Sequence, residues 1–457
     1  MADLGAALAA IVGERHVDVG DAINDDDTHD ECLTVTAVRP AAVVRPATTE
    51  EVAAVVTLAA EQGVPLTARG SGTGLSGACT PVDDGIVVSF ARMADIVEID
   101  LENHVAVVQP GVTLQELDEA LAPLGFVYPV FPGENSASLG GNVATNAGGM
   151  RAVKYGVTRH QVLGLTAVIG TGEVITTGGR FVKSTTGYDL TQLIIGSEGT
   201  LAIATEITLK LYPRPAHTAT VLAPFTTLEE VTAAVPPVVA SGIGPMIVEY
   251  IDRKVMSGIV KASDLELGVP REIRHQTAAY LVIVLEDRRA DRLDEDVEEL
   301  ATLLADLGAI DVYVLPPNAG TRLIEGRERI FWTAKELGAN DIVDMVVPRA
   351  AMADYMAKVS DLAASSGSVI VGCGQAGDGN VHLSVYEDDE ATREQVLRTL
   401  FTFGMEMGGA ISGEHGIGEA KKKYYLELED PTKVALLRRI KTAFDPAGIL
   451  NPGKIFP

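Results

Sequence analysis

The stretch ARGSGTGLSGAC spans residues 68–79 and contains the pattern GxGxxG, formed by Gly72, Gly74 and Gly77. In a Rossmann unit this pattern follows a strand and opens a helix whose N-terminus holds a dinucleotide pyrophosphate. The strand-like segment VPLTAR does precede these glycines. The segment after them contains Pro81 and then returns to a strand pattern, so it cannot supply a helix of several turns. The pattern therefore predicts a glycine-rich loop between two strands and argues against a nicotinamide-type Rossmann fold.

Three glycine-rich polar segments lie in the first half of the chain. The first, residues 68–79, has serine and threonine between its glycines, so its backbone N–H groups can converge on an anion. The second covers residues 132–156 and the third residues 183–213. Glycines allow the backbone to approach a ligand closely. Together the three segments predict one large cofactor wrapped by several loops.

Composition limits the partners and the compartment. The 457 residues are enough for two or three folding units. The formal net charge of −27 argues against nucleic acid and anionic membranes, but a local arginine or metal can still attract a small anionic substrate. Cys32, Cys79 and Cys373 form no CxxC pair and suit a reducing cytoplasm. The start lacks the basic residues of a signal peptide, and no apolar run is long enough to span a bilayer. We expect a cytoplasmic protein, with a peripheral position at the inner face of the membrane left open.

Local signals place helices and strands along the chain. Helices are predicted over residues 48–62 and 113–124, because each begins with a threonine followed three residues later by glutamate and each stops at a glycine. Residues 166–177 predict a hairpin, and YPRPAH indicates a domain boundary near residue 215. Beyond it, strands alternate with helical stretches, and the charge run 287–300 is typical of a solvated helix face. This order predicts an antiparallel sheet covered on one side.

Six segments occur in a fixed order: RGSGTGLSGA, SLGGNVATNAGG, KSTTGYDLTQLIIGSEGTLAI, GDGNVH, SGEHGIG and FDPAGILNPGKIF. Together they resemble the vanillyl-alcohol oxidase/p-cresol methylhydroxylase (PCMH) superfamily, most closely the branch of the glycolate oxidase flavin subunit, D-lactate dehydrogenase and D-2-hydroxyglutarate dehydrogenase. The resemblance covers nearly the whole chain. It implies an α+β fold with a two-part PCMH-type FAD-binding domain at residues 1–215, an α+β cap domain with an antiparallel sheet at 216–420, and a segment at 421–457 that returns to the FAD.

The same resemblance assigns FAD to the glycine-rich segments. Residues 69–76 would hold the pyrophosphate through backbone N–H groups, the 198–203 region would lie near the adenosine, and Asn451 would reach the isoalloxazine. The implied FAD-binding residues are Arg69, Gly70, Ser71, Gly72, Thr73, Gly74, Leu75, Ser76, Pro132, Gly133, Ser138, Gly141, Asn142, Thr145, Glu198, Gly199, Ile203 and Asn451. We expect non-covalent FAD, because the first loop lacks the histidine that tethers FAD in some members. Cys79 is interpreted as a small buried residue.

Two of the eight histidines lie in glycine-rich acidic segments near the C-terminus, His382 in GDGNVHLSV and His415 in SGEHGIG. Their chemistry makes His382 and Glu414 candidate metal ligands and His415 a candidate base. The resemblance implies a divalent metal, zinc or manganese, with a third ligand at position 375. The family has histidine there, whereas this chain has Gln375, a poorer zinc ligand. A weaker metal site, a site for a harder ion and a metal-free site all stay open.

The substrate site follows from the resemblance as well. Arg327 in IEGRERIFWTA matches the family arginine that binds a 2-hydroxy carboxylate, and Asn380 would help to hold the substrate or a metal-bound water. In the 2-hydroxyglutarate branch a threonine and a lysine serve the distal carboxylate. Those positions are Phe331 and Ile342 here. The exchange argues against 2-hydroxyglutarate and favours a short or apolar side chain, as in lactate.

The resulting hypothesis is an FAD-dependent 2-hydroxy acid dehydrogenase. It would oxidise a D-2-hydroxy acid to the 2-oxo acid by hydride transfer to FAD, with metal assistance and His415 as general base. Three alternatives stay open: a metal-independent alcohol oxidase on the same fold, an FAD-binding electron-transfer subunit of a larger complex, and a ligand-binding protein with a degenerate site. Quinone, electron-transfer flavoprotein and cytochrome remain candidate electron acceptors, and a homodimer stays open.

Overall fold

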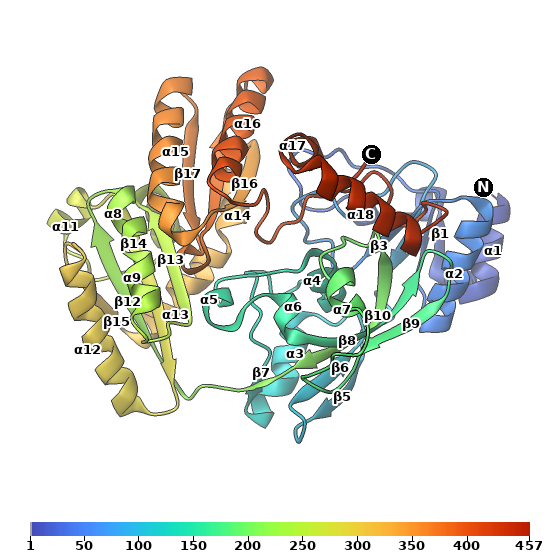
Figure 1. Ribbon diagram of the computed structural model, residues 1–457, viewed down its shortest axis with the longest axis horizontal. Coiled ribbons are helices and arrows are strands. Elements are labelled where there is room, and N and C mark those ends of the chain that lie inside the picture. Colours follow the sequence, from blue (N-terminus) through green and yellow to red (C-terminus); the bar gives the residue numbers. More distant parts are fainter. Residues whose placement is uncertain (1) are drawn as a thin grey trace.

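The computed structural model describes residues 2–457 and contains three main sheets (Figure 1). Residues up to Lys210 form a four-stranded and a five-stranded sheet, and residues from His217 onward form a seven-stranded sheet. Figure 1 shows the first two sheets on one side of the molecule and the seven-stranded sheet on the other. The α+β class, the two-part architecture of the first domain and the antiparallel sheet of the cap domain are thereby confirmed. No helix within residues 2–457 is both long and apolar enough to cross a membrane.

The four-stranded sheet lies next to both ends of the chain. Its order is β1 (Val17–Val19), β2 (Ala42–Val44), β4 (Ile86–Ser89) and β3 (Leu66–Arg69). β4 runs parallel to both of its neighbours. Helices α1 (Ala2–Val12) and α2 (Thr49–Gln62) pack against this sheet through an aliphatic core. No helix follows the first glycine-rich loop before β4 begins, as its Pro81 predicts.

Local capping sets the ends of α2. The Thr48 side chain accepts a hydrogen bond from the Glu51 backbone N–H at 3.2 Å, which satisfies a free donor of the first turn. Gly63 ends the helix with a left-handed φ of 66°, a conformation that glycine adopts without strain. Between these ends Val52, Val55 and Val56 are buried against the sheet. The helix predicted for residues 48–62 is confirmed.

The five-stranded sheet is antiparallel throughout. Its order is β5 (Ile96–Asp100), β6 (Val105–Val108), β10 (Ala202–Lys210), β8 (Val162–Ile169) and β9 (Val174–Gly178), so the hairpin predicted at 166–177 is present as β8–β9. Helix α3 (Leu114–Leu121) closes its core with a capping box of Thr113 and Glu116. The short elements here are β7 (Phe126–Val127), α4 (Leu139–Thr145), α5 (Ala152–Tyr155), α6 (Thr158–Gln161), α7 (Leu190–Ile194) and β11 (Tyr212–Pro213).

The seven-stranded sheet forms the centre of the cap domain, and all its pairings are antiparallel. Its order is β15 (Tyr313–Leu315), β12 (His217–Phe225), β14 (Ala279–Asp287), β13 (Ile247–Asp252), β17 (Val369–Gly374), β18 (Asn380–Tyr386) and β16 (Asp341–Val346). The sequence predicted that only one face of this sheet is covered, and this prediction is wrong. On β14, Leu281 and Ile283 pack into one core, while Tyr280 and Val282 pack into another, because both faces of the strand are buried.

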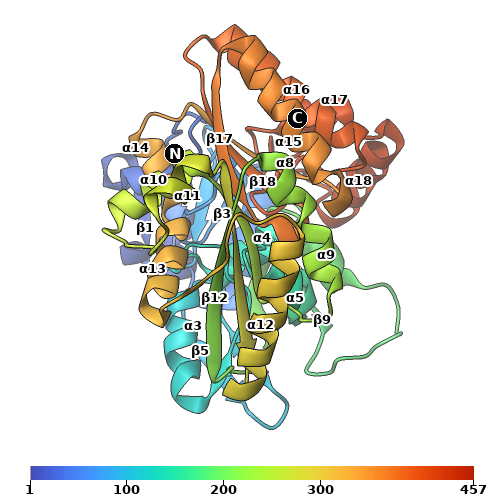
Figure 2. The ribbon, with the colours of Figure 1, turned by 90° about the vertical axis from the view of Figure 1, so that its left-hand side faces the viewer.

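Helices cover the two faces of this sheet. One core includes α8 (Leu228–Ala233), α9 (Val235–Ala240), α12 (Ala290–Asp306), α15 (Met352–Ser366) and α16 (Glu390–Glu406). The other includes α10 (Arg253–Ala262), α11 (Arg271–Gln276), α13 (Pro317–Glu328) and α14 (Ile330–Glu336). In Figure 2, α12 and α13 lie on opposite sides of β12. Residues 290–300 of the charged segment lie in α12, with Leu293 and Leu300 buried and most of the charged side chains exposed, as predicted for a solvated helix face.

The two halves of the molecule touch through α5 and through the C-terminal segment. Glu286 of β14 accepts hydrogen bonds from Tyr155 at 2.5 Å and pairs with Lys154 at 2.9 Å. After the cap domain, α17 (Lys422–Leu428) and α18 (Pro431–Phe444) run back over the first half of the chain (Figure 1). Leu450 then lies beside β3 and forms a parallel β-bridge with Leu66. The chain therefore starts and ends on the same sheet.

Candidate active site

The glycine-rich segments meet around one large cavity of about 1210 Å³, its open part included. Of the predicted FAD-binding residues, it is lined by Gly70, Ser71, Gly72, Thr73, Gly74, Leu75, Pro132, Gly133, Ser138, Gly141, Asn142, Thr145, Glu198 and Gly199. The third segment reaches the cavity only through its second half, because residues 183–190 are exposed at the surface. The cofactor-sized space therefore lies where the sequence predicts it.

Two glycines show why this wall excludes larger residues. A Cβ atom on Gly70 would lie 1.9 Å from the Ser138 hydroxyl of the second segment. Gly72 has a φ of +77°, and a Cβ there would lie 2.1 Å from the Arg69 guanidinium. The backbone of the first segment thus lies directly against the side chains of Ser138 and Arg69, and only glycine leaves room for this close approach.

Unpaired polar atoms indicate that the cavity suits a polar ligand. Asn142 Nδ2 and Asp30 Oδ2 are buried, belong to residues that line the cavity, and have no hydrogen-bond partner within residues 2–457. A buried donor and a buried acceptor without partners are costly unless a ligand or water completes them. An FAD molecule carries acceptors and hydroxyl donors for both. The residues present therefore fit this cofactor.

The remaining four predicted FAD-binding residues do not line the large cavity. Arg69 and Ile203 line an adjoining apolar cavity of about 470 Å³, and the Arg69 guanidinium donates to the His29 carbonyl at 2.6 Å. Ser76 and Asn451 are buried behind the lining. The Asn451 amide donates to the carbonyls of Ala78 and Glu198, at 2.8 and 2.7 Å, so it ties the first and third segments together. Direct contact of Ser76 or Asn451 with FAD stays a prediction.

Cys79 also lines the large cavity. Burial raises the pKa of its thiol to about 12, so the sulfur is protonated and a poor nucleophile at neutral pH. This environment agrees with the interpretation of Cys79 as a small packed residue and with non-covalent FAD.

A second cavity of about 660 Å³ adjoins the first. The two share the lining residues Leu75, Pro132, Gly133, Glu328, Phe331, Glu414 and His415. The second cavity also contains Arg327, His382 and Gln375, three of the residues predicted for catalysis and metal binding. The predicted cofactor and substrate regions are therefore neighbours, with His415 on their common wall.

Arg327 is held in the second cavity by a buried carboxylate. It lies in the last turn of α13, and its Nε donates to Glu249 Oε2 of β13 at 2.6 Å. The side chains are 8% and 0% exposed. Burial opposes the charge of Arg327, but Cys373 and the Glu249 carboxylate raise its pKa above the usual value, so the guanidinium stays charged. Its Nη2 lies 3.4 Å from His382 Nδ1, which turns the charged end toward the histidines.

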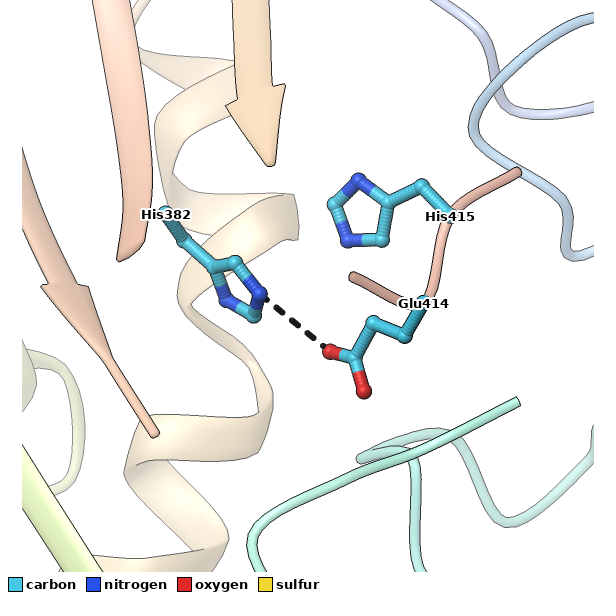
Figure 3. A group of neighbouring side chains, drawn as sticks. All are labelled: His382, Glu414 and His415. Carbon is cyan, nitrogen blue, oxygen red and sulfur yellow. Dashed lines mark ion pairs between the residues drawn. The ribbon is translucent and has the colours of Figure 1, made fainter. Parts of the chain in front are cut away.

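His382, Glu414, Gln375 and Asn380 form one connected polar cluster. His382 Nε2 of β18 lies 3.3 Å from Glu414 Oε1, and Figure 3 shows this pair beside His415. Gln375 donates to the same carboxylate oxygen at 2.9 Å, and its own carbonyl accepts from Asn380 Nδ2 at 3.1 Å. The five residues predicted for the metal and for catalysis near the C-terminus are therefore brought together.

Asp344 organises the loop that carries Glu414 and His415. This fully buried residue of β16 accepts four hydrogen bonds at Oδ2: from the Ser412 hydroxyl at 2.7 Å and from the backbone N–H groups of residues 413–415 at 2.9–3.0 Å. Burial opposes its charge, but His415, His382 and Lys421 hold the pKa of Asp344 well below its usual value. Asp344 is thus an anion that fixes the loop from the cap side.

The His415 ring is neutral at physiological pH. Burial lowers the pKa of this imidazole to about 3, an effect that Asp344, 4.0 Å from Nδ1, only partly opposes. Its Nδ1 has no hydrogen-bond partner among the described residues. A neutral imidazole on the wall between the two cavities is able to accept a proton there.

The sequence analysis missed Asp344, Glu249 and Lys421. Lys421 is 4% exposed, and its ammonium lies 3.9 Å from Asp344 Oδ2. A signal was present for the two acids, because each interrupts an apolar strand segment, MIVEY and DIVDMVV. A carboxylate inside a buried strand needs a cation or several N–H donors, so such positions are candidates for a functional site.

Comparisons with known proteins agree with this arrangement. Residues 40–178 match the model of an FAD binding domain, and residues 214–455 match that of the C-terminal domain of FAD linked oxidases. This chain belongs to the FAD-linked oxidase family. The resemblance drawn from the six segments is therefore confirmed, and with it FAD as the cofactor.

Several relatives cover almost the whole chain. An uncharacterized FAD-linked oxidoreductase of Mycobacterium tuberculosis is 55% identical over 100% of this chain and 99% of its own length. A D-lactate dehydrogenase of Anaerostipes hadrus is 37% identical (97% and 95% covered), and glycolate oxidase subunit GlcD of Bacillus subtilis is 36% identical (91% and 89% covered). The solved 4-ethylphenol oxidase from Gulosibacter chungangensis shares the fold, with a TM-score of 0.81 at 20% identity (100% and 97% covered). The protein is thus an FAD-linked oxidoreductase related to D-lactate dehydrogenase and glycolate oxidase.

Proposed function

We propose that this oxidase-family member oxidises a D-2-hydroxy acid with a short or apolar side chain to the corresponding 2-oxo acid. The observation that carries the proposal is the buried, Glu249-anchored Arg327 in a cavity that adjoins the cofactor cavity at His415. An arginine in fork geometry binds a carboxylate with two charge-assisted hydrogen bonds. Glu249 takes Nε and Nη2 lies 3.4 Å from His382 Nδ1, so Nη1 and the second N–H of Nη2 are left for the substrate.

The rest of the second cavity favours an apolar substituent. Arg327 is the only lysine or arginine among its described lining residues, so a second carboxylate would meet no cation of its own. The apolar part of the lining is formed by Leu75, Met150, Val255, Ile330, Phe331 and Ile342. Phe331 and Ile342 are the two positions at which the sequence departs from the 2-hydroxyglutarate pattern. A dicarboxylic substrate would leave one buried charge unpaired, which is costly.

Different residues of this chain would carry out the separate parts of the reaction. Arg327 binds and orients the substrate carboxylate, and neutral His415 takes the hydroxyl proton. Bound FAD supplies the oxidant that accepts the hydrogen of C2 together with its bonding electron pair. Asp344 favours the protonated His415 ring, because its carboxylate lies 4.0 Å from Nδ1. Asn380, within 3.2 Å of His382, holds the imidazole in place.

The same residues fit a divalent metal. Asp344 Oδ1, Asn380 Oδ1 and Glu414 Oε2 are buried acceptors without a hydrogen-bond partner among the described residues. Asp344 Oδ1 and Glu414 Oε1 lie 3.5 and 3.3 Å from His382 Nε2, close to the spacing of about 3.4 Å between ligand atoms of a tetrahedral zinc site.

The charges of the cluster favour a cation as well. Burial raises the pKa of Glu414, with Asp344 as a further cause, so a cation bound beside it would stabilise its charged form. His382, Glu414 and His415 each offer a ligand atom within 4.8 Å of the others, and we assign the ion to His382 and Glu414 of this group. Gln375 supports them, because its carbonyl already accepts from Asn380. Such an ion would polarise the substrate hydroxyl.

An anaerobic substrate panel tests the proposal. The holoenzyme is mixed with D- and L-forms of lactate, 2-hydroxybutyrate, 2-hydroxyisocaproate and 2-hydroxyglutarate, and loss of the yellow flavin absorbance is recorded with and without chelator. We expect bleaching by D-monocarboxylates and none by 2-hydroxyglutarate. Bleaching by phenols or simple alcohols instead, indifferent to chelator, would support an alcohol oxidase and overturn the assignment.

A further inference from the structure

The loop of residues 412–418 is held from both domains by one buried carboxylate each. On the cap side Asp344 accepts from the Ser412 hydroxyl and from the backbone of residues 413–415. On the FAD side Glu198 accepts from the backbone N–H of Ile417 at 2.8 Å and of Gly418 at 2.7 Å. His415 lies between these two attachments, so its position depends on both.

Glu198 is fitted closely to the loop. The residue is 5% exposed, and its two carboxylate oxygens each accept one of the two N–H groups. A Cβ atom on Gly416 would lie 3.0 Å from Glu198 Cδ, and Gly416 has a φ of +80°. The loop therefore passes directly over the carboxylate, and a side chain at position 416 would press against it.

The same stretch is also joined to the first glycine-rich segment. The Ser76 carbonyl accepts from the backbone N–H of Glu419 at 2.9 Å and of Ala420 at 3.1 Å. A Cβ on Gly418 would lie 2.1 Å from that carbonyl oxygen. Because Glu198 and its neighbour Gly199 line the large cavity, the cofactor wall and the loop that carries His415 form one hydrogen-bonded unit.

We propose that Glu198 is a positioning residue for His415 and that its carboxylate is not an FAD ligand. This inference rests on the proposed function, in which His415 takes the substrate proton. Both carboxylate oxygens are already engaged by the loop, so an adenosine contact through them would release an N–H group. A displacement of about 1 Å in a catalytic group can cost about 10²-fold in rate. Glu198 thus links the cofactor pocket to the geometry of the base.

A double-mutant cycle tests this role. Glu198→Gln keeps the size of the side chain but replaces one acceptor by a donor, so one loop N–H loses its partner. At saturating substrate we expect flavin reduction to slow by about 10–100-fold, with the FAD dissociation constant and the affinity for the 2-oxo acid product unchanged. In a His415→Ala background the same substitution should slow reduction no further, because the group it positions is absent.

The matched control is Asp445→Asn. Asp445 is 2% exposed, pairs with Lys441 and accepts from the backbone of Ile449 and Leu450, so it is a buried carboxylate whose partners lie outside the 412–418 loop. Its effect on the rate should be the same with and without His415. If Glu198→Gln does not fold, Gly416→Ala replaces it, since the added methyl would press on the same carboxylate.

Three outcomes would overturn the inference. Glu198→Gln could slow flavin reduction equally with and without His415, or it could reduce at the wild-type rate. It could also bind FAD more weakly and regain full activity once FAD is saturating. The last result would make Glu198 a cofactor ligand. If a His415→Ala variant reduces its flavin at the wild-type rate, the proposed function with His415 as base is refuted. This result is distinct from the outcomes that refute the positioning role of Glu198.

Discussion

Replacing Arg327 with lysine separates the charge of this residue from its shape. The ammonium keeps a counter-charge for Glu249, whose carboxylate is fully buried, but it cannot serve Glu249 and a substrate carboxylate in one planar fork. A hydrogen bond to a charged group contributes about 1.5–3 kcal/mol. Loss of one such bond therefore predicts a dissociation constant for the 2-oxo acid about 10–150-fold higher.

Lysine is preferred to alanine for this test. Arg327→Ala would leave the Glu249 carboxylate buried without its partner, a change that typically costs about 3–5 kcal/mol of stability and would confuse folding with binding. With lysine we expect the fold and the FAD content to persist.

The assay titrates the 2-oxo acid into oxidised holoenzyme and follows the flavin absorbance. Arg329→Lys is the matched control, because Arg329 is exposed two residues further along. Unchanged affinity in Arg327→Lys, or an equal loss in Arg329→Lys, would refute the assignment of the carboxylate site to Arg327.

Three further predictions concern the base, the metal and pH. His415→Ala should slow anaerobic flavin reduction by about 10²–10⁴-fold with FAD content unchanged, as measured by rapid mixing; a near-wild-type rate would remove its role as base. His382→Ala should lose bound metal in elemental analysis together with activity, whereas a metal-free, chelator-insensitive and fully active wild type would contradict metal assistance. Burial raises the pKa of Glu198 to about 7, above its unfolded value near 4.5, so the folded state holds the extra proton between these values. Thermal stability should therefore fall as pH rises from about 4.5 through 7, and Glu198→Gln should flatten this dependence; an identical pH profile in the variant would contradict the shift.

Features set by neighbouring residues could be predicted from the sequence. The threonine–glutamate caps of α2 and α3, the left-handed Gly63 and the β8–β9 hairpin each depend on contacts within a few residues. Pro81 correctly ruled out a helix after the first glycine-rich loop, because proline acts on its own backbone.

Features set by distant residues could not be predicted in the same way. Asp344 bonds to residues about 70 positions further along, and Arg327 to Glu249, 78 positions away, so neither partner is visible in a local pattern. The sequence also did not predict that helices pack on both faces of β14. A run of apolar residues does not show whether one face or both faces of a strand are buried. The candidates His382, Glu414 and His415 were predicted from their residue types in two glycine-rich acidic segments, and the family resemblance supported them. The residues that hold them in place are evident only from the fold.

The return of the C-terminus to β3 affects how the protein matures on the ribosome. Leu450 pairs with Leu66, and Asn451 bridges Ala78 and Glu198 behind the lining of the cofactor pocket, so these contacts form only once residues 450 and 451 have been synthesised. Domains usually fold from the N-terminus as they emerge. The first domain therefore depends for these contacts on residues that are synthesised after the cap domain.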